Sequence, residues 1–265
     1  MSPITVFQNL LFPPPSSIYV SIMSLVSVGS MANAGLSEIK GKHLQYSKFL
    51  NSKEPKQVQI SSKIGMFAMY SPAFLFGIAS FFVFPDHGLR FLLLRFALTI
   101  HFLKRVLEVL FVHRFGGSGV ALDTAFTVSF SYFLSTVTMI YAQHLSEGLP
   151  EPSIDLKYVG VGLFLLGIGG NFYHHYILST LRKTGEKEYK IPKGGLFDLV
   201  ICPHYFFEVL GFVGVSCIAQ TLYSVCYTTG AALYLIGRSY ATRKWYLSKF
   251  EDFPKDKKVM IPFIL

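Results

Sequence analysis

The amino-acid sequence predicts an all-α membrane protein, a polytopic bundle of seven transmembrane helices. The 265 residues are 51% hydrophobic and 15% charged, whereas soluble domains carry about 25% charged residues. Long windows without Asp, Glu, Lys or Arg each provide the roughly 20 residues that a spanning helix needs. The basic residues gather between these windows, as they do in short cytosolic loops. The uncharged windows are residues 1–37, 64–85, 124–143, 158–181 and 209–237.

The first span is expected within residues 1–37, after Pro13, Pro14 and Pro15. This window contains no Lys or Arg, so the charged start of a secretory signal is missing. Residues 38–63 then form a polar connection with six lysines and two glutamates, which we expect to face the cytosol.

The second span is expected over residues 64–84, and residues 85–88 form a tight turn on the far side of the membrane. A glycine-rich break at residues 116–119 separates the third span, residues 89–112, from a fourth that runs to about residue 143. The third span differs from the others because it contains several charged side chains: Arg90, Arg95, Lys104, Arg105 and Glu108.

The later connections alternate in charge. Residues 144–157 hold three acids and one lysine, as expected away from the cytosol, and a fifth span covers residues 158–181. Residues 182–198 are basic, and residues 199–237 suit two antiparallel spans. With seven spans, all basic connections and the tail, residues 238–265, face the cytosol. We expect a single membrane-embedded domain, residues 1–265.

The formal net charge of +9 does not indicate nucleic-acid binding, because the basic residues lie in connections rather than among aromatic residues on a polar face. Cys202, Cys217 and Cys226 lie in or beside apolar windows, without the paired spacing of zinc ligands. We therefore expect buried free thiols, no metal site and no nucleic-acid partner.

Polar side chains of the third span share one helical face. His101, Arg105 and Glu108 lie at i, i+4 and i+7, and Lys104 forms an i, i+4 pair with Glu108. Charged side chains at membrane depth cost at least ~2.5 kcal/mol each on insertion, so several in one span require a reason. The face is either an ion-paired helix end near the cytosolic surface or the wall of a polar cavity that contacts an anionic cofactor.

The fifth span ends in a second polar face, on which Asn171, His175 and Arg182 lie at i, i+4 and i+11. This face suits either a pyrophosphate-bearing cofactor that enters from the cytosol or a solvated helix end. His174 and His175 point to different sides, so a two-histidine metal clamp is not expected. The glycines of residues 167–170 lie inside an apolar helix without a preceding strand, which excludes a Rossmann site.

The sixth span begins with ionisable side chains, after a turn at Gly194 and Gly195. Tyr205 and Glu208 lie at i and i+3 and can point into one cavity. A carboxylate at membrane depth is a functional candidate, and the alternative for Glu208 is a structural ion pair with Arg238 or Arg243.

Two motifs near the C-terminus resemble those of the steroid 5α-reductase (3-oxo-5-alpha-steroid 4-dehydrogenase) family. Residues 189–197, YKIPKGGLF, are similar to the family signature, and residues 245–254, WYLSKFEDFP, with the IPF of 261–263, are similar to its closing motif. The resemblance is strongest over residues 158–265. Residues 101–115 and 202–205 look closer to the related trans-2-enoyl-CoA reductases, in which the tyrosine of the latter motif is thought to donate a proton.

The resemblance implies a seven-helix bundle in the endoplasmic-reticulum membrane, with a cytosolic C-terminus. It also implies that NADPH is held from the cytosolic side and that a lipid or steroid substrate comes from the bilayer. Arg105 joins the candidate cofactor-binding residues through its place on the third-span face. The positions that match cofactor-binding residues of the family are Asn171, Arg182, Tyr189, Lys190, Glu208, Arg238 and Tyr246, with imperfect matches at His175, His204 and Thr242.

At the imperfect matches, His175 stands where the family usually has an aspartate, His204 where it has an asparagine, and Thr242 where it has a histidine. The substrate site departs further, because steroid reductases hold the enone oxygen with a glutamate in the second span and a tyrosine in the third. Here Tyr70 and Phe102 stand at these positions. Tyr70 could donate the hydrogen bond instead, which leaves the steroid substrate open.

The implied activity is that of an oxidoreductase acting on CH–CH groups, with NADPH as hydride donor to the β-carbon of an α,β-unsaturated carbonyl lipid. The developing enolate needs a proton or hydrogen-bond donor. The first candidates for this donor are Tyr70 and Tyr205, and His101 is the third. The leading substrate is a 3-oxo-Δ4-steroid, reduced to its 5α product. The alternatives are a trans-2-enoyl-CoA of very-long-chain fatty-acid elongation, a polyprenol, or a non-enzymatic lipid-binding or scaffold role. The oligomeric state stays open.

Overall fold

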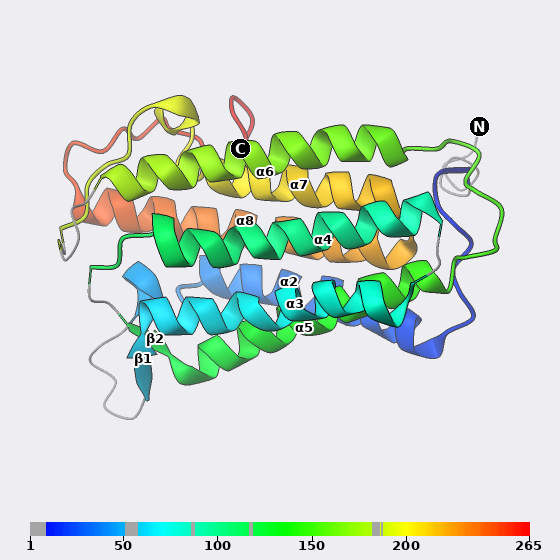
Figure 1. The fold of residues 1–265 in the computed structure, drawn as a ribbon. Coiled ribbons are helices and arrows are strands. Elements are labelled where there is room, and N and C mark those ends of the chain that lie inside the picture. The colour runs from blue at the N-terminus through cyan, green and yellow to red at the C-terminus, as the bar shows by residue number, and fades with distance from the viewer. Residues whose placement is uncertain (1–8, 51–57, 86–87, 117–118, 182–185, 187) are drawn as a thin grey trace.

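A computed structural model describes residues 9–50, 58–85, 88–116, 119–181, 186 and 188–265, so the predicted site residue Arg182 lies outside the described residues. Within this part of the chain, seven helices of 17 residues or more run side by side (Figure 1). They are α2 (Ile18–Ile39), α3 (Ser62–Val83), α4 (Leu89–Leu107), α5 (Leu122–His144), α6 (Lys157–Thr180), α7 (Pro203–Ala219) and α8 (Leu222–Lys249).

Hydropathy identifies this mostly helical protein as a membrane protein. Among the described residues, three helices are long and apolar enough to cross a bilayer, namely α2, α3 and α5. α7 is apolar but has 17 residues. A short π-helical segment, η2 (Glu108–Val112), continues α4, and 3-10 turns η1 (Ser47–Phe49) and η3 (Gly195–Asp198) lie in the connections.

Two helix ends differ from the prediction. The polar connection was expected to begin at Glu38, but α2 continues to Ile39 and buries Glu38. The tail was expected from residue 238, but α8 continues to Lys249. Residues 238–249 contain neither Gly nor Pro, so nothing in their sequence stops the helix.

Two short strands were also not predicted. β1 (Gln59–Ser61) pairs antiparallel with β2 (Gly119–Ala121), and Ile60 lies opposite Val120. The backbone N–H of Ala121 donates to the carbonyl of Gln45 at 3.0 Å. These contacts join the connection after α2 to the segments before α3 and α5, at one end of the bundle (Figure 1).

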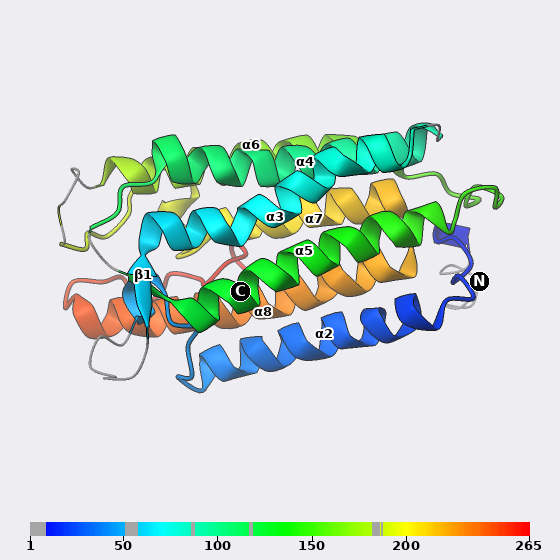
Figure 2. The same ribbon diagram turned by 60° about the horizontal axis from the view of Figure 1, so that its bottom comes forward.

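α6 and α7 pack almost backbone to backbone through glycines. A methyl group at Gly167 of α6 would lie 2.3 Å from the backbone nitrogen of Gly211, and one at Gly214 of α7 would lie 2.4 Å from that of Phe164. Real side-chain contacts are not this short, so α6 and α7 can approach this closely only because these residues lack a Cβ atom. α2 and α8, which lie together at one side of the bundle in Figure 2, meet in the same way at Gly35 and Gly237.

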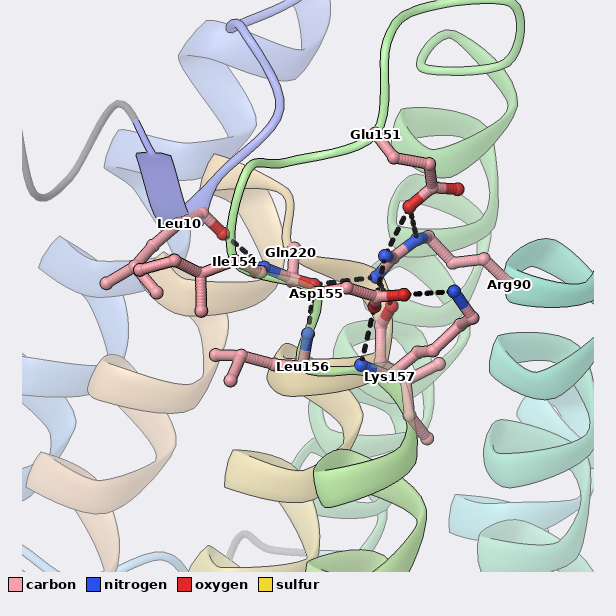
Figure 3. A network of polar contacts seen from close by, with 9 residues as sticks. Leu10, Arg90, Glu151, Ile154, Asp155, Leu156, Lys157 and Gln220 are labelled. Atoms are coloured by element: carbon pink, nitrogen blue, oxygen red, sulfur yellow. Dashed lines mark hydrogen bonds and ion pairs between the residues drawn. The ribbon is translucent and has the colours of Figure 1, made fainter.

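At the opposite end, Arg90 of α4 connects several loops (Figure 3). Its guanidinium pairs with the carboxylates of Glu151 and Asp155, and its Nη1 donates to the side-chain carbonyl of Gln220 at 2.9 Å. Gln220 lies in the α7–α8 turn and has a positive φ of 49°. Its side chain makes three more hydrogen bonds, to the N–H of Leu156 and the carbonyls of Leu10 and Ile154. One buried amide thus links the N-terminal segment, the α5–α6 loop and the α7–α8 turn.

Arg95 is another charged side chain of the predicted third span, and its hydrogen bonds give it a structural role. Its Nη1 donates to the carbonyls of Ser80 at 3.0 Å and Phe84 at 2.5 Å. The Ser80 carbonyl lies in the last turn of α3 and also accepts a hydrogen bond from the backbone N–H of Phe84, the C-cap residue, at 3.0 Å. The Phe84 carbonyl lies just past the end of the helix, where no further turn of α3 can donate to it. The side chain is 2% exposed and packs against the rings of Phe81 and Phe91. Arg95 therefore caps a neighbouring helix, at a distance from the candidate site.

Candidate active site

Two cavities lie at the end of the bundle that carries β1 and β2. The first, here called the basic cavity, has a volume of about 240 Å³. Among its described lining residues there is no Asp or Glu, and the cations are Lys48, Arg114, Lys190 and Arg238. The second, the tyrosine cavity, has a volume of about 270 Å³. Its tyrosines are Tyr46, Tyr70, Tyr132, Tyr189, Tyr205 and Tyr234.

The two cavities share a wall, so a ligand that spans both would pass its side chains. His204 and Tyr205, in the first turn of α7, line both cavities. Their rings lie 4.2 Å apart. Tyr46, in the connection after α2, also lines both, and its hydroxyl lies 3.3 Å from that of Tyr234 on α8. The shared wall therefore combines phenol and imidazole groups, which can donate or accept protons.

Aromatic rings support the basic cavity. The ring of Tyr189 meets that of Trp245 at 4.8 Å, and the ring of Tyr246 stacks on Phe253 at 5.0 Å. The ammonium group of Lys48 lies 5.0 Å from the centre of the Tyr246 ring. These contacts place cations beside aromatic faces, an arrangement suited to an anionic ligand that also carries flat rings.

Arg105 organises the polar side of the tyrosine cavity. Its Nη2 donates to the hydroxyl of Tyr70 at 2.5 Å, and its Nη1 lies 2.8 Å from Glu108 Oε2 and 2.9 Å from His175 Nδ1. All four side chains are buried. α3, α4 with η2, and α6 each contribute to this group, in which the buried charges of Arg105 and Glu108 are paired.

Glu108, His113 and His175 place three potential metal-ligand atoms within 4.8 Å of one another. Burial, together with the charges of His175 and Arg105, lowers the pKa of His113, so its ring is neutral at physiological pH. The Arg105 guanidinium, however, already contacts both Glu108 and His175. A cation there would meet an arginine that cannot be deprotonated, so the absence of a metal site stays our prediction.

A second polar group lies deeper between α4, α6 and α7. The side-chain oxygen of Asn171 accepts a hydrogen bond from Lys104, and its nitrogen donates to the carbonyl of His204 at 2.7 Å. Glu208 lies 3.5 Å from the same nitrogen and also lines the tyrosine cavity. His101 packs against the ring of Phe212 at 4.9 Å and lines neither the basic cavity nor the tyrosine cavity.

The structure brings most of the predicted site residues to the two cavities, while Asn171 and His101 lie beside a small void of about 10 Å³. The structural alternative for Glu208, an ion pair with Arg238 or Arg243, does not occur, because Arg238 pairs with Glu38 and Arg243 donates to backbone carbonyls of the tail. Lining residues not singled out as site residues from the sequence include Lys48 and Arg114. The predicted residues in the basic cavity are Tyr189, Lys190, His204, Tyr205, Arg238, Thr242 and Tyr246. Those in the tyrosine cavity are Tyr70, Arg105, His175, Tyr189, His204, Tyr205 and Glu208.

The cysteines have no partner among one another. Cys202 is buried, Cys217 and Cys226 are half-buried, and all three are free thiols. The expectation of burial therefore holds for Cys202, whereas Cys217 and Cys226 are more accessible than expected. Cys202 also lines the basic cavity.

Comparison with known proteins identifies the family. The family model described as 3-oxo-5-alpha-steroid 4-dehydrogenase matches residues 118–265, which is more than half of the chain. The chain belongs to this family. This match confirms the family resemblance that was predicted from the motifs of the C-terminal half.

Relatives of this member of the 3-oxo-5-alpha-steroid 4-dehydrogenase family include both branches seen in its motifs. It is 34% identical over 171 residues to the very-long-chain enoyl-CoA reductase of Dictyostelium discoideum, covering 63% of this chain and 56% of that protein. It is 34% identical over 172 residues to 3-oxo-5-alpha-steroid 4-dehydrogenase 1 of Mus musculus, covering 63% and 66%. The alignments thus span less than two thirds of the length of these relatives.

Proposed function

We propose that this chain is a seven-span enzyme of the endoplasmic-reticulum membrane that uses NADPH to reduce the carbon–carbon double bond of an α,β-unsaturated carbonyl lipid. The observation that carries the proposal is the shared wall between a cavity with four cations and a cavity that holds the Tyr70–Arg105 pair. A basic cavity suits a dinucleotide phosphate, and a neighbouring donor suits the carbonyl of the substrate.

The residues of the basic cavity fit NADPH by their chemistry. Lys48, Arg114, Lys190 and Arg238 offer charge-assisted hydrogen bonds to phosphate oxygens. Tyr189 and Tyr246 offer aromatic faces to the flat rings of a dinucleotide. Bound NADPH supplies the hydride that adds to the β-carbon of the substrate.

Tyr70 is the proton donor that we favour. The Arg105 guanidinium donates to the Tyr70 oxygen, so the phenolic proton of Tyr70 must point to another acceptor. When hydride adds to the β-carbon, the electrons of the double bond move to the carbonyl oxygen and form an enolate. A proton from Tyr70 neutralises this charge, and Arg105 stabilises the phenolate that remains. Tyr205, on the shared wall, is the second candidate.

The charge distribution supports a cytosolic position for the cavities and the C-terminus. The end of the bundle with Lys48, Lys190 and the tail is rich in basic residues, while the opposite end holds Glu147, Glu151 and Asp155. Basic residues concentrate on the cytosolic side of membrane proteins. α4, α6, α7 and α8 complete the seven spans in this proposal, with α4 placing its charges against other helices rather than lipid.

For the substrate, we propose a 3-oxo-Δ4-steroid first, on the strength of the C-terminal motifs. The second candidate is a long-chain trans-2-enoyl-CoA, which the similarity to the Dictyostelium enoyl-CoA reductase favours. Phe102, which stands where steroid reductases have a tyrosine, weakens the case for a steroid. Purified protein with NADPH should convert one of these substrates, and product analysis by mass spectrometry distinguishes them. The third compound to test is a polyprenol precursor that carries a conjugated carbonyl. If the protein oxidises NADPH with none of the three substrates, the proposal is contradicted.

A further inference from the structure

Glu38 is a buried carboxylate that the proposed chemistry does not use. It lies in the last turn of α2 and is 1% exposed. Oε1 accepts hydrogen bonds from Arg238 Nη1 at 2.6 Å and from the backbone N–H of Leu44 at 3.0 Å, and Oε2 lies 2.6 Å from His43 Nδ1. A carboxylate is buried in this way only when charges and donors compensate it.

The partners of Glu38 belong to the basic cavity or lead into it. Arg238, on α8, lines that cavity. His43 and Leu44 begin a segment of residues 43–50, here called the strap, which presents Tyr46, Ser47, Lys48 and Phe49 to the cavity. One side chain of α2 therefore contacts both walls of a site that α2 itself does not line.

Arg238 lies between Glu38 and the strap. Its guanidinium carbon is 4.4 Å from the centre of the Tyr46 ring and 4.1 Å from that of Phe49. The strap has only one 3-10 turn of regular structure, η1, so its position depends on contacts of this kind. Gln45 also anchors the backbone of the strap, because its carbonyl accepts from the N–H of Ala121 at 3.0 Å and its N–H donates to the Thr124 hydroxyl at 3.4 Å.

We propose that Glu38 is a positioning residue of the cofactor site, which orients Arg238 and fastens the strap so that Lys48 and Tyr46 face the basic cavity. The proposal rests on the proposed function, because it assigns that cavity to NADPH. The negative charge of Glu38 holds the guanidinium and the strap together, while Glu38 itself touches neither cofactor nor substrate.

The first test is the substitution Glu38→Gln, which keeps the size of the side chain and an oxygen that can accept the Leu44 N–H. It removes the charge that faces Arg238. The KM for NADPH should rise about tenfold while kcat changes less than about threefold, because charge-assisted hydrogen bonds are the stronger ones. Glu251→Gln, which neutralises an exposed glutamate at the same end of the bundle, is the matched control and should leave KM unchanged.

The second test does not depend on activity. Hydrogen–deuterium exchange of the purified protein without cofactor should be at least about tenfold faster in strap peptides of Glu38→Gln than in the parent protein. Peptides of α5 should exchange as before, which shows that the variant is folded. If Glu38→Gln does not fold, Glu38→Asp, which keeps the charge on a shorter side chain, takes its place and should loosen the strap to a smaller extent.

Unchanged exchange in the strap would overturn the proposal, whatever the kinetics. Faster strap exchange with a raised KM supports it. A parent protein that oxidises no NADPH with any tested lipid would refute the proposed function, and the exchange comparison would still decide whether Glu38 positions the strap.

Discussion

At the scale of single residues, Tyr70 has the most closely defined surroundings of the candidate donors, because Arg105 fixes its oxygen from one side. Replacing Tyr70 by Phe removes the hydroxyl and retains the ring that stacks on Tyr132. We expect kcat to fall by about 10²–10³-fold with little change in the KM for NADPH. The measurement is steady-state kinetics of microsomes or purified protein with whichever of the proposed substrates the protein converts.

Tyr205→Phe is the matched variant, since Tyr205 also lines the tyrosine cavity but lies on the wall that this cavity shares with the basic cavity. It should retain most of the activity if Tyr70 is the donor. The reverse result, an active Tyr70→Phe and an inactive Tyr205→Phe, would move the donor role to the shared wall.

Lys48 provides a second test at this scale. Its ammonium group lies beside Trp245 and Tyr246 in the basic cavity, so Lys48→Gln should raise the KM for NADPH about tenfold and leave kcat nearly unchanged. Lys63→Gln, which removes an exposed lysine near the same end, is the control. Equal effects of both substitutions would indicate a general loss of surface charge rather than a cofactor contact.

Lys48 also shows where prediction from the sequence stops. It is one of six lysines in residues 38–63, and charge pattern alone predicts only that the connection faces the cytosol. Which lysine folds back over the bundle depends on the strap and its contacts. Glu208 and Tyr205 were easier to single out, because ionisable side chains at the start of an apolar span are unusual in themselves.

At the scale of secondary-structure elements, the α6–α7 contact gives a matched pair of substitutions. Gly167→Ala would place a methyl group 2.3 Å from the backbone of Gly211, whereas Gly211→Ala meets its nearest atom at 3.9 Å. Gly167→Ala should destabilise the protein by about 1–3 kcal/mol, and Gly211→Ala should be neutral or slightly stabilising. Thermal unfolding in detergent measures both, and equal melting temperatures would contradict the packing.

The Gln220 side chain gives the second test of an element, the α7–α8 turn. Gln220→Gly removes four side-chain hydrogen bonds and should cost about 2–4 kcal/mol, because buried groups on three segments lose their partner. Gln220→Ala should cost about 1 kcal/mol more, since alanine must also adopt the positive φ of this residue. An alanine variant as stable as the glycine variant would show that backbone conformation is not important here.

The positions of α2, α3 and α5 could be predicted from the sequence because these helices are apolar along most of their length. Their ends could not. α2 continues through Glu38 because Arg238, 200 residues away, compensates the buried charge, and no local pattern contains that information. The β1–β2 pair was missed for the same reason, since three-residue strands are defined by their partner rather than by their own periodicity.

At the scale of the whole molecule, the two ends of the bundle should face different compartments. In a variant without native cysteines, Lys249→Cys should react with an impermeant maleimide added to sealed microsomes, because it lies at the basic end. Ser153→Cys, at the acidic end, should react only after the membrane is permeabilised. The opposite pattern would place the cavities in the lumen and rule out a cytosolic cofactor.

The contact between α2 and α8 has a consequence for biosynthesis. The first and the last long helix of the described chain, α2 and α8, meet at Gly35 and Gly237. During synthesis, Arg238 leaves the ribosome about 200 residues after its partner Glu38. Until then, the nascent chain holds Glu38 with only its local partners, His43 and Leu44, and without the arginine that also contacts the strap. Completion of α8 is therefore the step that closes the bundle, and chains arrested before it should be recognised as unfinished by the cell's quality control.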